Sequence, residues 1–144
     1  MDNSPKSFAE ALHEEHTALL ADLHQLDDAV HAGSRASPME LGTRLTHLRT
    51  HLLEHFRFEE EGGYMAPVLH EEPRLGPEIQ GLLDEHGQLA QTLDALIQEA
   101  SAAQTLDDGL REKVRGWAKR VRQHEAHENN LVQEAYYSAG ATGD

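Results

Sequence analysis

Apolar residues recur at every third or fourth position in four long segments of the chain, which is the pattern of amphipathic helices. These segments cover about residues 5–32, 38–61, 77–102 and 106–137. In the second, the stripe is formed by Leu41, Leu45, Leu48 and Leu52. A Ser-Pro pair opens each of the first two segments, as expected of helix starts. No stretch alternates with period two over any useful length, so the sequence predicts an all-α protein.

The lengths of the segments and of the connections between them indicate how the helices pack. Four helices of about 25–30 residues with mostly short connections favour an up-down-up-down antiparallel four-helix bundle. Residues 64–76 contain Pro67 and Pro73 and are expected to form a turn-rich connection. The fourth helix is expected to open near Thr105, with Asp108 completing a capping box. We expect one domain over residues 1–144, with a flexible tail from 138 to 144.

Polar residues interrupt the apolar stripe of every predicted helix. The interrupting residues are His16, His55, Glu59, His86, His124 and Glu128. In the second and fourth helices the glutamate follows the histidine by four positions, so both side chains lie on one helix face, about 6 Å apart. The depths of the four histidines from the helix ends differ by about 9 Å at most. Antiparallel packing would therefore bring all six side chains to one level of the bundle.

The two halves of the chain also resemble each other. His16 and His55 lie 39 positions apart, and His86 and His124 lie 38 apart. The segment "EEHTALLADL" around the first histidine resembles "DEHGQLAQTL" around the third. The chain therefore reads as two related helical hairpins that supply His, His and Glu to a shared pseudo-twofold centre.

Two explanations compete for these six polar residues. A single histidine on an apolar stripe is more often a hydrogen-bonded core residue than a ligand, and a buried glutamate usually pairs with arginine or lysine. No lysine or arginine lies on these stripes, and burying two unpaired carboxylates would cost several kcal/mol each. Four imidazoles and two carboxylates suit two borderline divalent metals bridged by the carboxylates, as in di-iron or di-manganese bundles. Zinc accepts the same ligand types.

The remaining histidines fall into two groups. Those off the stripes are expected to be solvated, namely His24, His31, His47 and His70. His13, His51 and His127 lie one helical turn from a candidate ligand and are candidates for contacts around it. In the run Glu59-Glu60-Glu61, only Glu59 has the helical phase to face inward.

Composition and charge narrow the function classes. A formal net charge of −14 excludes duplex nucleic acid as a favoured partner. No apolar run is long enough to span a membrane, and no apolar segment lies near Met1. The absence of cysteine excludes disulfides and thiolate metal sites. We expect a cytoplasmic protein whose partners are cations, small molecules or an unknown protein.

Four segments resemble the ligand-bearing segments of hemerythrin-like (HHE cation-binding) domains. They are "EEHTALL", "HFRFEEEGGYMAP", "DEHGQLA" and "HEAHENNLV", and the resemblance covers about residues 8–137. It implies a four-helix bundle with a non-haem di-iron centre. In that centre His16 and His55 would ligate one iron, and His86 and His124 the other. Glu59 and Glu128 would bridge the two irons together with an oxo or hydroxo group.

The chain departs from the oxygen-carrying hemerythrins in two respects. Those proteins have a second histidine on the third helix, four residues from the first, where this chain has Leu82 and Ala90. Their fourth-helix acid is an aspartate five residues after the histidine, whereas Glu128 follows His124 by four. Both departures weigh against reversible oxygen carriage. The spacing is closer to that of the bacterial iron–sulfur repair di-iron proteins, whose extra carboxylate corresponds to Glu85.

The resemblance implies a di-iron protein that binds or reacts with oxygen, peroxide or nitric oxide, with weak oxidoreductase activity toward peroxide or nitric oxide as one form of that reactivity. A second hypothesis is a non-catalytic module that senses or stores iron or oxygen. A third is a structural bundle whose histidines are incidental.

Overall fold

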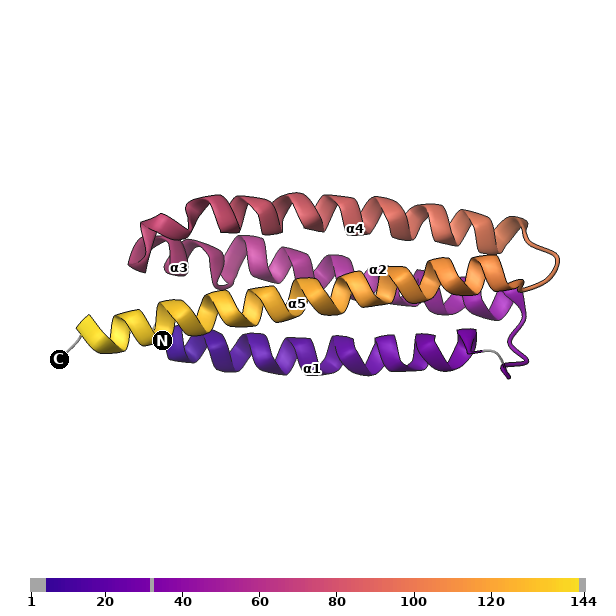
Figure 1. Ribbon diagram of the computed structural model, residues 1–144, viewed down its shortest axis with the longest axis horizontal. Coiled ribbons are helices and arrows are strands. Elements are labelled where there is room, and N and C mark those ends of the chain that lie inside the picture. The colour runs from indigo at the N-terminus through magenta and orange to yellow at the C-terminus, as the bar shows by residue number, and fades with distance from the viewer. Residues whose placement is uncertain (1–4, 32, 143–144) are drawn as a thin grey trace.

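Four long helices make up most of the molecule (Figure 1). The computed structural model describes the backbone of residues 5–31 and 33–142, and the side chains of residues 10–31, 33–61 and 63–135. The long helices are α1 (Pro5–Val30), α2 (Pro38–Arg57), α4 (Gly76–Ala102) and α5 (Asp108–Thr142). A π-helical turn, η1 (Phe58–Gly62), continues α2. The short helix α3 (Met65–Glu71) and the 3-10 turn η2 (Pro73–Leu75) then lead into α4.

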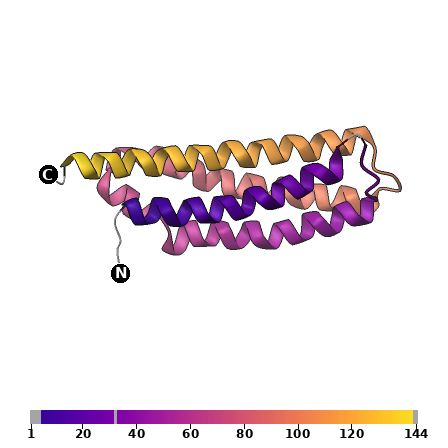
Figure 2. The same ribbon diagram turned by 90° about the horizontal axis from the view of Figure 1, so that it is seen from below.

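The long helices pack side by side, and successive ones run in opposite directions (Figures 1 and 2). Each contacts two others: α1 packs against α2 and α5, and α4 packs against the same pair. No residue in the described ranges belongs to a strand. The predicted all-α, up-down-up-down antiparallel four-helix bundle is therefore confirmed. None of the described helices is long and apolar enough to cross a membrane.

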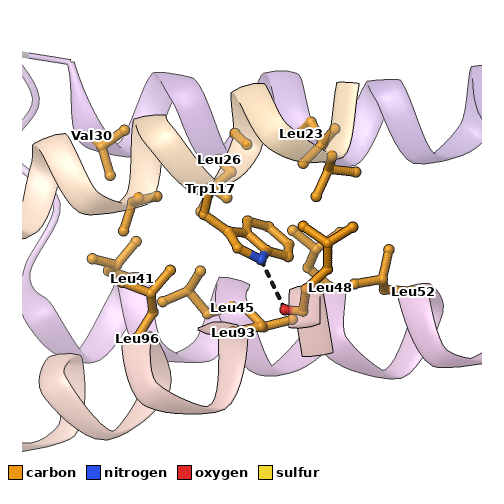
Figure 3. Close-up of a cluster of buried hydrophobic side chains, with 14 of the residues drawn as sticks. Leu23, Leu26, Val30, Leu41, Leu45, Leu48, Leu52, Leu93, Leu96 and Trp117 are labelled. Atoms are coloured by element: carbon orange, nitrogen blue, oxygen red, sulfur yellow. Dashed lines mark hydrogen bonds between the residues drawn. The ribbon is translucent and has the colours of Figure 1, made fainter. Parts of the chain in front are cut away.

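Two apolar clusters fill the interior. The larger surrounds Trp117, whose indole N–H donates to the Leu89 carbonyl over 3.0 Å (Figure 3). The smaller joins the helix ends beside α3 and consists of Leu12, Tyr64, Met65, Val68, Leu75, Ile79, Leu82, Leu131, Val132 and Ala135. Along α5, Val121 belongs to the first cluster and Leu131 to the second. A short polar layer separates the two, and the predicted ligands lie in it.

The helix ends agree with the sequence in part. Ser37 caps α2 as expected, because its hydroxyl accepts the backbone N–H of Glu40 over 3.1 Å. The expected capping box at Thr105 is wrong: the Asp107 carboxylate accepts the N–H of Leu110 over 2.8 Å, so α5 begins at Asp108. Asp107 stands immediately before the first helical residue, which is the position from which a side chain reaches the free N–H groups.

The segment after η1 is more ordered than a turn-rich connection. Pro67 lies in the first turn of α3, where no intrahelical N–H bond is lost. Met65, Val68 and Leu75 are buried in the smaller cluster, so this segment closes the end of the bundle. The other difference is at the carboxyl end, where α5 runs to Thr142, past the expected end near Tyr137. A single glycine in a helix costs only about 1 kcal/mol, so Gly140 does not end it. Residues 143–144 lie outside the described part.

Candidate metal centre

All six predicted ligands meet in the polar layer between the two apolar clusters. His16 comes from α1, His55 from α2, Glu59 from η1, His86 from α4, and His124 and Glu128 from α5. Each is at most 4% exposed, and both glutamates are fully buried. No lysine or arginine contacts either of these carboxylates within the described residues. The layer therefore has the composition of a cation site.

Glu59 divides its two carboxylate oxygens between the halves of the bundle. Its Oε2 lies 3.2 Å from Nε2 of His55 and 3.5 Å from Nε2 of His16. Its Oε1 lies 3.0 Å from Nε2 of His86. The Glu59 carboxylate therefore lies between imidazoles of both halves of the bundle.

Glu128 occupies the corresponding place opposite Glu59. Its Oε1 lies 3.2 Å from Nε2 of His16 and 3.3 Å from Nε2 of His124. Its Oε2 lies 3.6 Å from Nε2 of His86 and accepts a hydrogen bond of 2.6 Å from the Tyr64 hydroxyl. Both carboxylates thus contact imidazoles of both halves.

The donor atoms form two overlapping groups, each able to hold one ion. His16, His55, Glu59 and Glu128 form one group, and Glu59, His86, His124 and Glu128 form the other. Within each group one donor atom per residue lies within 4.8 Å of every other. Neighbouring donors on an octahedral ion with bonds of about 2.1 Å are about 3 Å apart, which matches the separations of 3.0–3.6 Å.

Hydrogen bonding alone leaves much of this layer unsatisfied. The buried atoms with no hydrogen-bond partner among the described residues include both oxygens of Glu59 and Nε2 of His55, His86 and His124. Buried polar atoms are nearly always paired, because an unmade bond costs about 1–3 kcal/mol. A cation bound between these atoms would satisfy them together, so the residues fit a metal ion.

The outer nitrogen of each histidine faces a second set of polar residues. Nδ1 of His86 contacts Glu60 at 2.6 Å, and Nδ1 of His124 contacts Glu85 at 2.9 Å. Nδ1 of His16 contacts the Asn129 side-chain oxygen at 3.0 Å, and Nδ1 of His55 lies 3.6 Å from Glu15. Such partners fix the imidazole tautomer and aim Nε2 at the centre.

These contacts correct what the sequence indicated about the surroundings of the site. The prediction that Glu60 does not face inward is confirmed, because the residue is exposed. Its carboxylate nevertheless contacts Nδ1 of His86 at the edge of the polar layer. Glu85 contacts His124, the histidine of the next helix. Among the described contacts, those of His51 and His127 are with Asp22 and Glu78, and His13 is exposed, so none of these three supports a ligand. The histidines expected to be solvated are indeed exposed: His24, His31, His47 and His70.

Two buried polar residues at this level were not predicted from the sequence. Tyr64 follows the helix break at Gly62-Gly63 and donates to Glu128. Glu125 is 3% exposed, and neither of its oxygens has a hydrogen-bond partner among the described residues. Its helical phase repeats that of two other buried residues seven positions away, Ala118 and Val132. This spacing of seven was the signal that the sequence offered. The three residues lie beside the main apolar stripe of α5, however, and not on it.

The charges in this layer perturb one another. Burial alone would lower the pKa of His16, but the neighbouring carboxylates of Glu128 and Glu59 raise it to about 10. The same balance raises the pKa of His86 to about 10. Burial raises the pKa of Glu125 to about 7, against the lowering effect of His16 and His55. Burial would also raise the pKa of Glu128, yet its imidazole neighbours hold that pKa well below the usual range.

The residue that follows the π-helical turn carrying Glu59 is a glycine for a steric reason. A Cβ at Gly63 would lie 2.6 Å from the Phe58 carbonyl oxygen and 2.8 Å from Cα of Glu59. These are backbone atoms that no side-chain rotation can move. Single π turns occur frequently at functional sites, and here the turn positions a candidate ligand.

Gly63→Ala is therefore expected to destabilise the protein by about 1–3 kcal/mol, and to weaken metal binding by displacing Glu59. The matched control is Gly116→Ala on α5, where nothing lies within 4 Å of the added Cβ. That change should be neutral or stabilise the helix by about 0.5–1 kcal/mol. Urea unfolding of both metal-free variants measures the difference. Equal stability of the two variants would contradict the close approach at Gly63.

The chain matches the family model described as "Hemerythrin HHE cation binding domain" over residues 7–136. Comparisons with curated proteins and with solved structures give no significant match. The matched region contains all six residues of the buried layer, and its description agrees with a layer suited to a cation. The chain belongs to the hemerythrin HHE cation-binding domain family.

Proposed function

We propose that this protein binds two iron ions between the four helices and acts as a non-haem di-iron protein on small ligands such as oxygen, peroxide or nitric oxide. The observation that carries the proposal is the sharing of Glu59 and Glu128 by both donor groups. One ion bound in either group would leave the two histidines of the other group without a metal. Two ions joined by carboxylates use all of them.

The donor count supports a centre that takes an additional ligand. Each ion would receive two imidazole nitrogens and an oxygen from each of the two glutamates. An octahedral ion has six positions, so a bridging oxo or hydroxo group still leaves room for one small molecule. When bound, iron would supply redox chemistry and these open positions. The protein would supply the ligands, the outer partners that orient them, and a dry enclosure.

Iron is the metal we propose, although manganese and zinc accept the same donors. Loading the metal-free protein with ferrous iron under anaerobic conditions should give two ions per chain. Air oxidation should then produce near-ultraviolet absorption from an oxo-bridged ferric pair. Azide should shift this spectrum, and slow peroxide consumption should be measurable. Metal analysis and optical titration test these outcomes.

His124→Ala removes one nitrogen donor and should lower the iron content below two. The matched control is His47→Ala, which changes an exposed histidine and should leave two ions bound. One metal ion in the wild-type protein, or none, would contradict the dinuclear proposal. Two ions with no response to azide would indicate a closed centre and favour a sensing or storage role.

A further inference from the structure

The two halves of the proposed centre correspond residue by residue. His16, His55 and Glu59 occupy the places that His86, His124 and Glu128 occupy in the second half. The correspondence extends outward, because the residue before each first histidine contacts the second histidine of its half. Those contacts are Glu15 with His55 and Glu85 with His124. A perfectly symmetric centre would offer two equivalent positions for an incoming ligand.

The first break in this symmetry lies in the outer partners. Nδ1 of His86 contacts a carboxylate, Glu60, whereas Nδ1 of His16 contacts the amide of Asn129. A carboxylate partner makes a ligating imidazole a stronger electron donor than an amide partner does. The ion beside His16 would therefore be the more electrophilic of the two.

The second break lies in the residue that follows the second histidine of each half. Phe56 follows His55 and stacks on His86 of the other half, with ring centroids 3.8 Å apart and planes 11° apart. The corresponding residue after His124 is Glu125. The correspondence that pairs Phe56 with His86 of the other half pairs Glu125 with His16. One side of the centre thus has an aromatic ring where the other has a carboxylate.

Glu125 has no structural partner that explains its burial. Its side chain is 3% exposed, and both oxygens lack a hydrogen-bond partner within the described residues. The residues one heptad away on the same face, Ala118 and Val132, are apolar and fully packed. A buried carboxylate in such a position is unfavourable unless another group bonds to it. A polar ligand on the neighbouring ion would be such a group.

We propose that the exogenous ligand binds on the His16–His55 side of the centre and hydrogen-bonds to Glu125. The ligand class is a small molecule with a terminal atom that forms hydrogen bonds, such as hydroperoxide or azide, rather than an apolar diatomic molecule. Glu125 acts on the ligand directly and not through another residue. This inference rests on the proposed di-iron function.

Azide binding to the iron-loaded protein tests the role of Glu125. Glu125→Gln keeps a hydrogen-bonding side chain of the same shape, and Glu125→Leu removes it. Azide should bind at least about tenfold more weakly to the Leu variant than to the Gln variant, which is the effect of one hydrogen bond to a charged group. The same two substitutions at Glu112, which is exposed on α5, should give equal affinities. Circular dichroism and iron content verify that each variant folds and loads.

Mössbauer spectra of the protein loaded with ⁵⁷Fe test which side binds the ligand. The two ferric ions should give two doublets, one perturbed by Asn129→Asp beside His16 and the other by Glu60→Gln beside His86. Azide should shift the first doublet. A shift of the second doublet, or equal azide affinity in the two Glu125 variants, would overturn the inference while two irons remain bound. Fewer than two irons in the wild-type protein would overturn the proposed function, and the inference with it.

Discussion

Glu59→Ala is expected to remove metal from both positions of the centre, and Glu128→Ala should do the same. Each carboxylate belongs to both donor groups, so its loss would take an oxygen donor from each of the two proposed ions. It also removes one of the two carboxylates that lie among the four imidazoles, which weakens the attraction for any cation. By contrast, loss of a single histidine affects one group directly. Metal content after loading and gel filtration should fall well below one ion per chain.

The three consecutive glutamates of η1 provide matched controls for this prediction. Glu60→Ala removes the partner of His86 and should weaken the affinity for one ion by about 10–100-fold while two ions still bind in excess metal. Glu61→Ala changes an exposed residue and should have little effect. Competition with a chelator distinguishes the metal affinities of the Glu59, Glu60 and Glu61 variants. Equal metal loss in the Glu59 and Glu61 variants would show that the helical turn is placed wrongly.

Metal loading is expected to raise the melting temperature by roughly 10–20 °C. Each ion at a free concentration of about 100 times its Kd adds about 2.7 kcal/mol to the free energy of unfolding, and a domain of this size gains a few degrees per kcal/mol. The proposed ions would bind only the folded bundle, because folding brings the four helices together. Thermal unfolding followed by circular dichroism, with metal and with chelator, measures the shift.

The pH dependence of stability should differ in direction between the two forms. In the metal-free protein, carboxylate contacts outweigh burial and raise the pKa values of His16 and His86 to about 10, above 6.5 in the unfolded chain. The stability contributed by these protonated imidazoles is complete below pH 6.5 and is lost as the pH rises through about 10. The melting temperature of the metal-free protein should therefore fall between pH 7 and 10.

The metal-loaded protein should instead lose stability in acid. Its imidazoles must be deprotonated to bind an ion, so protons compete with metal near and below pH 6.5. Binding near pH 7 should also release protons, which calorimetry detects in buffers of different ionisation enthalpy. If both forms showed the same pH dependence, the histidines would not be exchanging protons for metal.

The sequence alone determined which six polar residues converge and their level in the bundle. Helical periodicity fixes where a side chain points from its own helix, so His55 and Glu59 had to share a face with Leu48 and Leu52. Distances along antiparallel helices then placed all four histidines at one depth. Both conclusions depend on geometry within single helices, and the structure bears out the convergence.

Only the tertiary structure decided what surrounds those residues. Glu60 contacts His86 and Glu85 contacts His124 because of the rotation of neighbouring helices about their axes, which no repeat within one helix encodes. Glu125 lies beside the main stripe, and its burial depends on how closely another helix approaches. The helix α3 forms where its apolar side chains close the end of the bundle. Contacts between elements depend on packing, and packing involves residues far apart in the chain.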